Sequence, residues 1–518
     1  MNEAVDVVIV GAGAAGSYFA AKLQGAGKQV VVLEAGPERG LEDLVSSSIW
    51  ARRLKWGGPP VDSQGVPIGH NVNFGWGLGG AALHHYATWP RFAEETFHIR
   101  ERYGVGLDWP IAYDDLRAHY DAIQREVGIA GDAEDEPSRP PGEPYPLPPL
   151  PVFAQGERLK AGFDAIGVDV GALPAAILTR AYNGRDACIY DGWCESGCPI
   201  GALANPLVLH IPEAKRLGAE FRTECAATGV LTDETGQARG VRYVDAAGEV
   251  REQHADVVIL AASCVQNPRL LLASAGAKHP DGLANSSGLA GANFMVDGLA
   301  AVYGLFDDPM ENVFGVNAGQ LFHRAAYEDG RARAPGAYQW QLAPAIKPND
   351  LAGIAGARPD LIGPDLHDFM RRAAHGLAVA AGFASTLPDA QNRVELSSET
   401  DSTGTPLARV VYRNAPEAEA LWAHIAAEGV AAANAAGARE AWHGRPAPVH
   451  ISGGTVMGDD PARSVTDGYG RTHDVSNLVL AGAGLFPYTG GSSPTFTLYA
   501  LAHRTAEHMI EHWSEYAA

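Results

Sequence analysis

The 518-residue sequence has few cysteines and comparatively few positive charges. It has five cysteines, an odd number, and three of them crowd together at Cys188, Cys194 and Cys198. This pattern does not fit a secreted protein held by a disulfide framework. The formal net charge is −22, which excludes the basic surface that nucleic acid or an anionic membrane would need.

Long hydrophobic runs are absent as well. No uncharged apolar run reaches the roughly 18 residues that suggest a membrane-spanning helix, so we expect no direct membrane insertion. The N-terminus runs straight into a strand-like segment without a basic and apolar leader, which favours a cytoplasmic protein. The motifs HExxH, Walker A and GxSxG are missing, so a metalloprotease, a P-loop NTPase and an α/β-hydrolase have no support.

Glycine, in contrast, is abundant, with 61 residues. Such an excess indicates many tight turns and close backbone approaches, as a buried cofactor requires. The chain is 46% hydrophobic and 19% charged, which is typical of a globular protein. Its length exceeds one ordinary hydrophobic core, so we expect two or more domains.

The clearest motif is a strand, turn, helix and strand at the N-terminus. The apolar strand Val7–Val10 leads directly into a GxGxxG sequence. Gly11 allows the tight turn, Gly13 lets the backbone approach a pyrophosphate, and Gly16 lets the helix pack against the strand. Glu34 ends the next strand, where it can hold ribose hydroxyls. The sequence therefore predicts a dinucleotide site, although this motif alone does not separate FAD from NAD.

Several further elements are expected from periodicity and composition. They are a helix over 108–127, an extended polyproline-type connector over 137–151, a hairpin and buried strand over 238–262, strands at 393–396 and 408–412, a helix over 415–437, a strand at 477–480 and a helix from Pro494.

Many separated segments resemble the glucose–methanol–choline (GMC) oxidoreductase family. They are residues 31–37 (VVLEAGP), 75–80 (GWGLGG), 387–396 (LPDAQNRVEL), 450–458 (HISGGTVMG) and 477–497. Residues 103–116 and 285–287 are similar to the flavin subunits of bacterial sugar dehydrogenases, such as FAD-dependent glucose dehydrogenase and gluconate dehydrogenase. The resemblance spans nearly the whole chain.

The resemblance implies an α/β Rossmann-type FAD-binding domain interleaved with an α+β, sheet-based substrate domain. The flavin domain is expected from residues 1–95, 188–300 and 441–518, and the substrate domain from 96–187 and 301–440. The resemblance also implies that FAD is held by Gly11, Gly13, Ala14, Gly16, Glu34, Ala35, Gly79, Gly80, His84, Ala227, Gly482, Pro494 and Thr495. A bond between His84 and the flavin, as in pyranose oxidases, and binding without one are both open.

The activity that the resemblance implies is oxidation of an alcohol, favouring a sugar or glycoside hydroxyl, by hydride transfer to the flavin. His450 stands where the family keeps its base, and a histidine suits this role because its ordinary pKa is about 6.5. Ser493 has two interpretations. It is either an N-cap before Pro494 in the first helical turn or a hydroxyl that binds substrate oxygen beside His450.

The three clustered cysteines resemble the three-cysteine [3Fe–4S] site of the sugar dehydrogenases. The alternative is a loop with free or buried thiols, as in family oxidases that pass electrons to oxygen. Zinc is disfavoured because no histidine or fourth cysteine lies nearby, and Asp191 stands where relatives often have that cysteine.

Two departures from the family pattern concern the active site. Gly482 replaces an acidic residue, and the common run Asn-Leu-Met-Asp-His appears as residues 293–297, Asn-Phe-Met-Val-Asp. A non-redox FAD lyase on the same fold and an electron-transfer flavin subunit remain alternatives. The resemblance also allows a small subunit or electron-acceptor protein as partner, with co-export to the periplasm as the alternative location.

Overall fold

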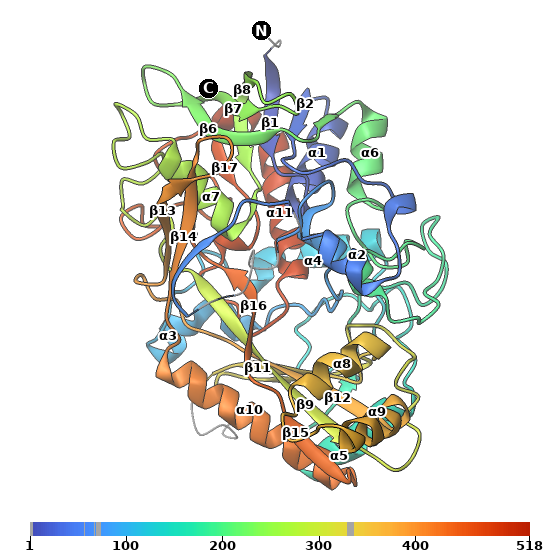
Figure 1. The fold of residues 1–518 in the computed structure, drawn as a ribbon. Coiled ribbons are helices and arrows are strands. Elements are labelled where there is room, and N and C mark those ends of the chain that lie inside the picture. The colour runs from blue at the N-terminus through green and yellow to red at the C-terminus, as the bar shows by residue number, and fades with distance from the viewer. Residues whose placement is uncertain (1–3, 56, 67, 69–73, 329–335, 518) are drawn as a thin grey trace.

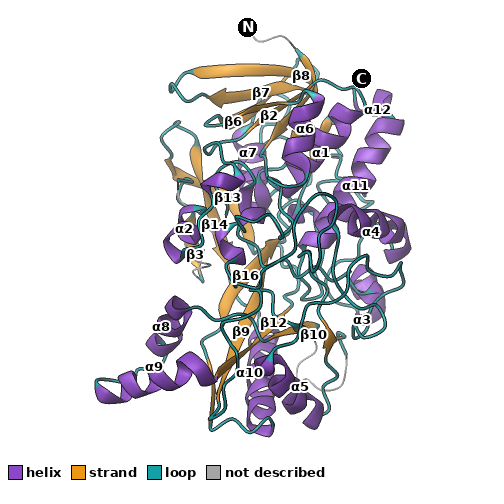
Figure 2. Ribbon diagram, turned by 90° about the vertical axis from the view of Figure 1, so that its right-hand side faces the viewer, coloured by secondary structure: helices purple, strands orange, loops and turns teal. Residues whose placement is uncertain are grey.

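The computed structural model describes residues 4–55, 57–66, 68, 74–328 and 336–517. The chain forms two lobes, each built around its own large sheet (Figure 1). The upper lobe contains β1, β2 and β8, and the lower lobe contains β9, β11 and β12. Both termini lie at the outer end of the upper lobe in both views (Figures 1 and 2).

The first sheet has seven strands within the described residues, in the order β5-β2-β1-β8-β7-β6, with β17 also paired to β8. Their bounds are β1 Val5–Val10, β2 Val30–Leu33, β5 Glu220–Arg222, β6 Ala226–Thr232, β7 Ala238–Val244, β8 Val250–Leu260 and β17 Leu478–Leu480. The strands β5, β2, β1, β8 and β17 run parallel, so their carboxyl ends share one edge. A dinucleotide binds at this edge in Rossmann folds.

Helices pack against the first sheet or against one another beside it. They are α1 (Ala14–Gly25), α6 (His210–Leu217), α7 (Ser263–Ala273), α4 (Tyr113–Val127), α11 (Thr495–Glu511) and α12 (Trp513–Tyr516). α1 packs against α6 and α11, and α11 also packs against α4. The shorter helices α2 (Ser48–Arg53) and α3 (Ile99–Tyr103) lie in the connections.

The second sheet is antiparallel throughout, in the order β15-β9-β12-β11-β10-β4, with β16 also paired to β9. The bounds are β4 Gly171–Ala172, β9 Met295–Leu305, β10 Leu321–Ala325, β11 Tyr338–Leu342, β12 Leu377–Ala384, β15 Glu440–His443 and β16 Ala447–Ser452. Because side chains alternate along a strand, Val302 and Ala380 join the core under α10 (Pro416–Ala435) and α5 (Ala154–Ala165), while Val379 faces the other way.

The remaining elements cover the opposite face or lie between the lobes. They are α8 (Pro348–Gly356), α9 (Pro364–Gly376), β3 (Asp62–Gly65), β13 (Arg393–Thr400) and β14 (Pro406–Tyr412). β13, β14 and β3 form a third, small sheet. The predicted mixture of a Rossmann-type domain and a sheet-based domain is thus confirmed. The domain limits stay predictions, and β16 extends the second sheet past residue 440.

Most predicted elements are present, with shifted ends. The helix expected over 108–127 starts at Tyr113, because Pro110 lies in the turn before it and the Asp115 carboxylate accepts the Ala112 N–H at 2.8 Å. The strands β9, β10, β11 and β12 were not predicted from the sequence. β9 and β12 are almost wholly buried and mostly apolar, so they lack the alternation of polar and apolar residues that reveals a strand.

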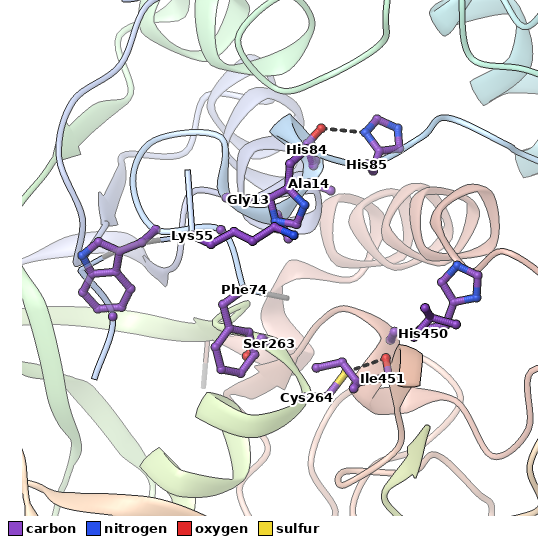
Figure 3. A pocket seen from close by; sticks show the side chains of 18 of the residues that line it. Gly13, Ala14, Lys55, Phe74, His84, His85, Ser263, Cys264, His450 and Ile451 are labelled. Carbon is purple, nitrogen blue, oxygen red and sulfur yellow. Dashed lines mark hydrogen bonds between the residues drawn. The ribbon is translucent and has the colours of Figure 1, made fainter. Parts of the chain in front are cut away.

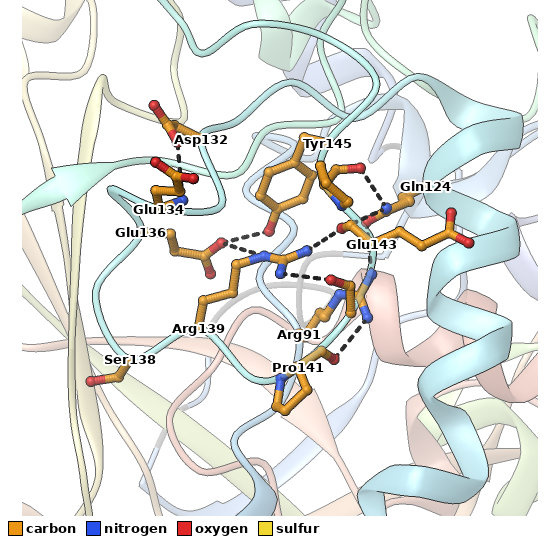
Figure 4. Close-up of polar contacts among 12 residues, drawn as sticks. Arg91, Gln124, Asp132, Glu134, Glu136, Ser138, Arg139, Pro141, Glu143 and Tyr145 are labelled. Atoms are coloured by element: carbon orange, nitrogen blue, oxygen red, sulfur yellow. Dashed lines mark hydrogen bonds and ion pairs between the residues drawn. The ribbon is translucent and has the colours of Figure 1, made fainter.

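The proline-rich connector over 137–151 forms neither helix nor strand, as predicted. Polar contacts hold it in place instead (Figure 4). Gln124 donates to the carbonyl oxygens of Glu143 and Pro144, at 3.0 Å each, and Arg139 donates to the Glu143 carbonyl at 2.6 Å. The connector therefore serves as a fixed strap over α4 rather than as a loose linker.

Candidate active site

The glycine turn after β1 has the geometry that a dinucleotide site requires. Gly11 has a φ of +99°, and a Cβ there would lie 2.7 Å from the Ala261 oxygen. A Cβ on Gly16 would lie 1.9 Å from the Gly11 oxygen, so only glycine lets α1 approach the turn this closely. A Cβ on Gly13 would meet only the Gly80 Cα, at 3.9 Å. Gly13 therefore faces open space into which a phosphate fits.

Glu34 directly follows β2 beside this turn, and it is buried. Its carboxylate accepts backbone N–H groups from Ala12 at 3.0 Å, Gly36 at 2.9 Å and Gly77 at 3.3 Å. Burial raises the pKa of Glu34, while these three donors act to lower it. The carboxylate is thus fixed in place and ties the first glycine turn to the second glycine segment.

A cavity of about 1220 Å³ opens beyond the turn and reaches the second sheet (Figure 3). Most of the predicted site residues line it. They are Gly11, Gly13, Ala14, Glu34, Ala35, Gly80, His84, Ala227, His450, Gly482, Ser493, Pro494 and Thr495. Gly16 and Gly79 do not line it. Gly16 packs α1 against the turn, and Gly79, at a φ of +99°, donates its N–H to the Ala12 oxygen at 3.1 Å.

The cavity fits FAD together with a substrate. Pockets for one drug-sized ligand measure about 300–1,000 Å³, and this cavity is larger. The open cradle at Gly13 suits a pyrophosphate, and the start of α1 supplies N–H groups to it. At the far end, Pro494 and Thr495 bring the N-terminus of α11 to the cavity wall. A helix N-terminus there favours negative charge on a bound ring.

Two adjacent histidines line the cavity near the glycine turn (Figure 3). Burial, with a smaller contribution from the Lys55 cation, lowers the pKa of His84 to about 3. The His84 Nε2 atom is buried and has no hydrogen-bond partner among the described residues. His85 differs, because its Nδ1 lies 2.7 Å from the Ala82 oxygen and its Nε2 accepts the Trp89 N–H at 3.2 Å. Of the two rings, His84 is the one with a nitrogen left for a ligand.

His450 reaches the cavity through a β-bulge in β16. Val449 pairs with Asp297 and Ile451 pairs with Val296, so His450 is the extra residue between them. It has a φ of +42°, which is uncommon for a residue other than glycine. Bulges of this kind re-aim a side chain, and here the ring stacks on Phe383 with centroids 5.3 Å apart.

A buried carboxylate lies behind the His450 ring. The Asp297 Oδ2 is 3.8 Å from the His450 Nδ1, and the Asp297 side chain is 0% exposed. The Thr489 hydroxyl donates to Asp297 at 3.1 Å. Burial raises the pKa of Asp297, while the His450 ring and the Thr489 hydroxyl act to lower it. The arrangement is a histidine with one nitrogen facing an acid, which leaves its other nitrogen for the cavity.

Ser493 does not cap α11, contrary to one of its two interpretations. The helix begins at Thr495, the capping position is Pro494, and no side chain caps it. The Ser493 oxygen instead accepts hydrogen bonds from Gln339 at 3.0 Å and Gln341 at 3.3 Å. These long-range partners lie on β11, so the helix start depends on tertiary packing rather than on a local cap.

Comparison with known proteins decides the family. Residues 6–56 match an FAD binding domain model, and residues 148–297 and 388–502 match two GMC oxidoreductase models. The large subunit of fructose dehydrogenase from Gluconobacter japonicus is 30% identical, over 98% of this chain and 97% of that protein. The chain belongs to the GMC oxidoreductase family.

Two further similarities agree with this GMC assignment. The 2-methyl-1,2-propanediol dehydrogenase of Mycolicibacterium austroafricanum is 30% identical, over 99% of this chain and 96% of that protein. A solved FAD-dependent oxidoreductase from Chaetomium thermophilum superposes with a TM-score of 0.71 at 15% identity, covering 98% of this chain and 100% of that one, and so shares the fold. The chain is an FAD-dependent GMC oxidoreductase that acts on CH–OH groups.

The cysteine triad of this GMC enzyme lies around a small cavity of about 10 Å³, together with Asp191. Each sulfur accepts a backbone N–H: Cys188 from Tyr190 at 3.3 Å, Cys194 from Asn317 at 3.4 Å and Cys198 from Leu203 at 3.4 Å. Burial raises the pKa of Cys188 to about 12 and also raises those of Cys194 and Cys198. Without a metal the three groups are therefore neutral thiols.

Sequence reasoning assigned no role to the polar residues that surround His450 and Ser493. Asp297 was noted only as a departure from the GMC pattern. Gln339 and Gln341 alternate with buried aromatic and apolar residues in β11, a period of two that could have marked them as facing one side. Among the described residues, no helix has the length and apolar character to span a membrane.

Proposed function

We propose that this enzyme oxidises a hydroxyl of a sugar or glycoside to a carbonyl, with His450 as the base. The bulge that directs His450 into the flavin cavity, with Asp297 behind the ring, is the observation that supports this most strongly. His450 is 23% exposed, so the ring is held by its surroundings yet accessible to a ligand in the cavity.

The chemistry divides into a proton and a hydride. FAD bound along the glycine turns would accept the hydride from the carbon that bears the hydroxyl. His450 takes the hydroxyl proton at Nε2, because Nδ1 faces Asp297. The imidazolium that results lies beside Asp297, whose negative charge would stabilise it. Burial raises the pKa of Asp297, and the Thr489 hydroxyl and the His450 ring act against that increase.

The walls around His450 suit a substrate with several hydroxyls. Ser493 accepts from two glutamines, so its own hydroxyl hydrogen remains to donate to a substrate oxygen. The cavity volume leaves room for a sugar ring beside FAD. The similarity to fructose dehydrogenase supports a sugar as the substrate. The similarity to 2-methyl-1,2-propanediol dehydrogenase supports a small diol as the second candidate.

A substrate screen tests the proposal. Purified enzyme is assayed with sugars, glycosides and 2-methyl-1,2-propanediol, each with a dye acceptor and with oxygen. We expect the highest kcat/KM for a sugar or glycoside. Turnover of the small diol alone would contradict the sugar assignment, although it would still support oxidation of an alcohol. Absence of flavin bleaching with every alcohol would instead favour a lyase or an electron-transfer subunit.

We propose further that the triad of Cys188, Cys194 and Cys198 binds an iron–sulfur cluster. The support is the donor set, since backbone N–H groups aimed at sulfur stabilise thiolate ligands. The present cavity of about 10 Å³ holds at most about one water, so the loop must open to admit a cluster. A cluster there would carry single electrons to a partner subunit or acceptor protein.

The cluster has its own test, which is independent of the substrate. Anaerobically purified wild type should contain iron in proportion to protein, about three per chain for a three-cysteine cluster, and Cys194→Ser should lose it. Iron-free wild type with full flavin and steady turnover would remove the cluster from the proposal and leave free thiols.

A further inference from the structure

A second group of ligating side chains lies away from the flavin cavity, where α4 meets α11. His119 projects from α4, and His503 and Glu507 project from successive turns of α11. None of the three lines the large cavity. Their ligand atoms lie within 4.8 Å of one another.

The three atoms form a nearly equilateral triangle. The His119 Nδ1 lies 2.9 Å from the His503 Nδ1, and the Glu507 Oε2 lies 3.3 Å from the first and 3.2 Å from the second. Zinc binds nitrogen and carboxylate oxygen at about 2.0–2.2 Å in a tetrahedron, which separates neighbouring ligand atoms by about 3.3–3.6 Å. The triangle therefore has close to the dimensions of one tetrahedral face.

Hydrogen bonding alone does not satisfy this arrangement. One proton between the two Nδ1 atoms leaves one nitrogen with a lone pair that also faces the Glu507 carboxylate. A proton on both Nδ1 atoms would place two hydrogens within the 2.9 Å that separates the nitrogens. A cation at the centre accepts all three lone pairs at once.

The surroundings also permit a cation. The side chains of His119 and His503 are 19% and 14% exposed, so both rings are largely withdrawn from water. Asp115 and Glu126 add negative charge nearby, against the positive charges of Arg504 and Lys22. The Glu507 side chain is 55% exposed, which leaves a path for the ion and a position for water.

We propose that His119, His503 and Glu507 form a binding site for a divalent transition-metal ion, with zinc as the best match. Two imidazoles and one carboxylate are a recognised zinc donor set, with water in the fourth position. The ion joins α4 to α11, the helix whose first residues line the flavin cavity. The Tyr120–Thr497 hydrogen bond of 2.6 Å links the same two helices nearer the cavity.

A neighbouring cluster serves as an internal control. His508, His512 and Glu515 also bring three ligand atoms together. There, however, His508 Nδ1 is already bonded to the Tyr516 hydroxyl at 2.8 Å, and Glu515 lies 3.9 Å from the Arg471 guanidinium. Its ligand atoms have other partners, so we expect weaker binding or none.

The experiment titrates ZnCl₂ into EDTA-treated, FAD-loaded enzyme by calorimetry, with Cys194→Ser as the background so that the thiol triad contributes less. We expect about one zinc per chain, lost in His503→Asn and retained in His512→Asn. Glu507→Gln leaves both histidines intact and should weaken binding, whereas Glu511→Gln on the same helix should not. Zinc should raise Tm in the background enzyme and in His512→Asn, but not in His503→Asn.

Equal zinc binding by the background enzyme and by both Glu507→Gln and His503→Asn would overturn the site. So would a zinc-edge anomalous peak elsewhere and none among the three residues. If His503→Asn fails to fold, Glu507→Gln and the anomalous peak still decide, because the carboxylate is half exposed and its change leaves the helix contacts in place.

Discussion

The two ends of the flavin cavity are built in different ways. At the glycine turn, backbone atoms of neighbouring residues create the site, with Gly11 and Gly16 fixing the turn and Gly13 opening it. At the substrate end, side chains from distant segments create it, with His450 and Asp297 brought together across two strands. The first end tolerates almost no added atoms, whereas the second end depends on charge and hydrogen-bond direction.

The largest effect should come from substitutions in the glycine turn. Comparing Gly16 with Gly13 separates a glycine needed for packing from a glycine that faces the ligand. Gly16→Ala places a Cβ 1.9 Å from the Gly11 oxygen, so we expect poor folding and little bound FAD. Gly13→Ala meets only Gly80 at 3.9 Å, so the chain should fold with near-normal Tm but retain less FAD. Flavin absorbance per protein and thermal melting measure both. Equal behaviour of the two variants would contradict the distinction.

The next largest effect should come from the base. His450→Gln keeps a polar side chain but cannot take the hydroxyl proton, so kcat/KM should fall by about 10²–10⁴-fold. FAD content should stay normal, because His450 lies at the substrate end. Steady-state assays with the best alcohol give the result. Wild-type kcat/KM in this variant would show that another group takes the proton.

Asp297 should matter less than His450, because it acts through the ring. A closely bonded His–Asp pair contributes up to about 10⁴-fold, and the 3.8 Å separation here predicts a smaller loss for Asp297→Asn. Burial raises the pKa of Asp297, so protonation of its carboxylate should contribute to the loss of activity as the pH falls, and Asp297→Asn should change the acid limb of the pH–rate profile. Thr489→Val is the matched control and should shift the profile less. An unmoved profile in Asp297→Asn would leave Asp297 with a structural role.

Ser493→Ala should give the smallest effect. Since Ser493 caps no helix, the substitution should lower the free energy of unfolding by less than the roughly 0.5–2 kcal/mol that loss of a cap costs. Tm should therefore change little. Loss of the hydrogen bond to the substrate oxygen should raise KM more than it lowers kcat. A fall in kcat as large as that of His450→Gln would instead place Ser493 in the proton transfer.

The same contrast explains what the sequence could predict. The dinucleotide motif lies within one strand–helix–strand unit, so its residues could be recognised from local sequence. The cofactor end could therefore be predicted in detail, down to Gly11, Gly13, Gly16 and Glu34. His450 was identified only by family resemblance, since its neighbouring residues do not predict the bulge. Asp297 and the partners of Ser493 depend on strand pairing over more than 150 residues, which no local pattern encodes.

In the proposed reaction, a substrate C–H bond breaks beside His450, and bound FAD would accept the hydrogen. Anaerobic stopped-flow mixing of the enzyme with its best alcohol, with protium or deuterium on the carbinol carbon, tests it directly. We expect the flavin absorbance to bleach, more slowly with deuterium, and bleaching to be almost abolished in His450→Gln. Flavin that stays oxidised with every alcohol, or bleaches at the same rate with both isotopes and in both proteins, would contradict it.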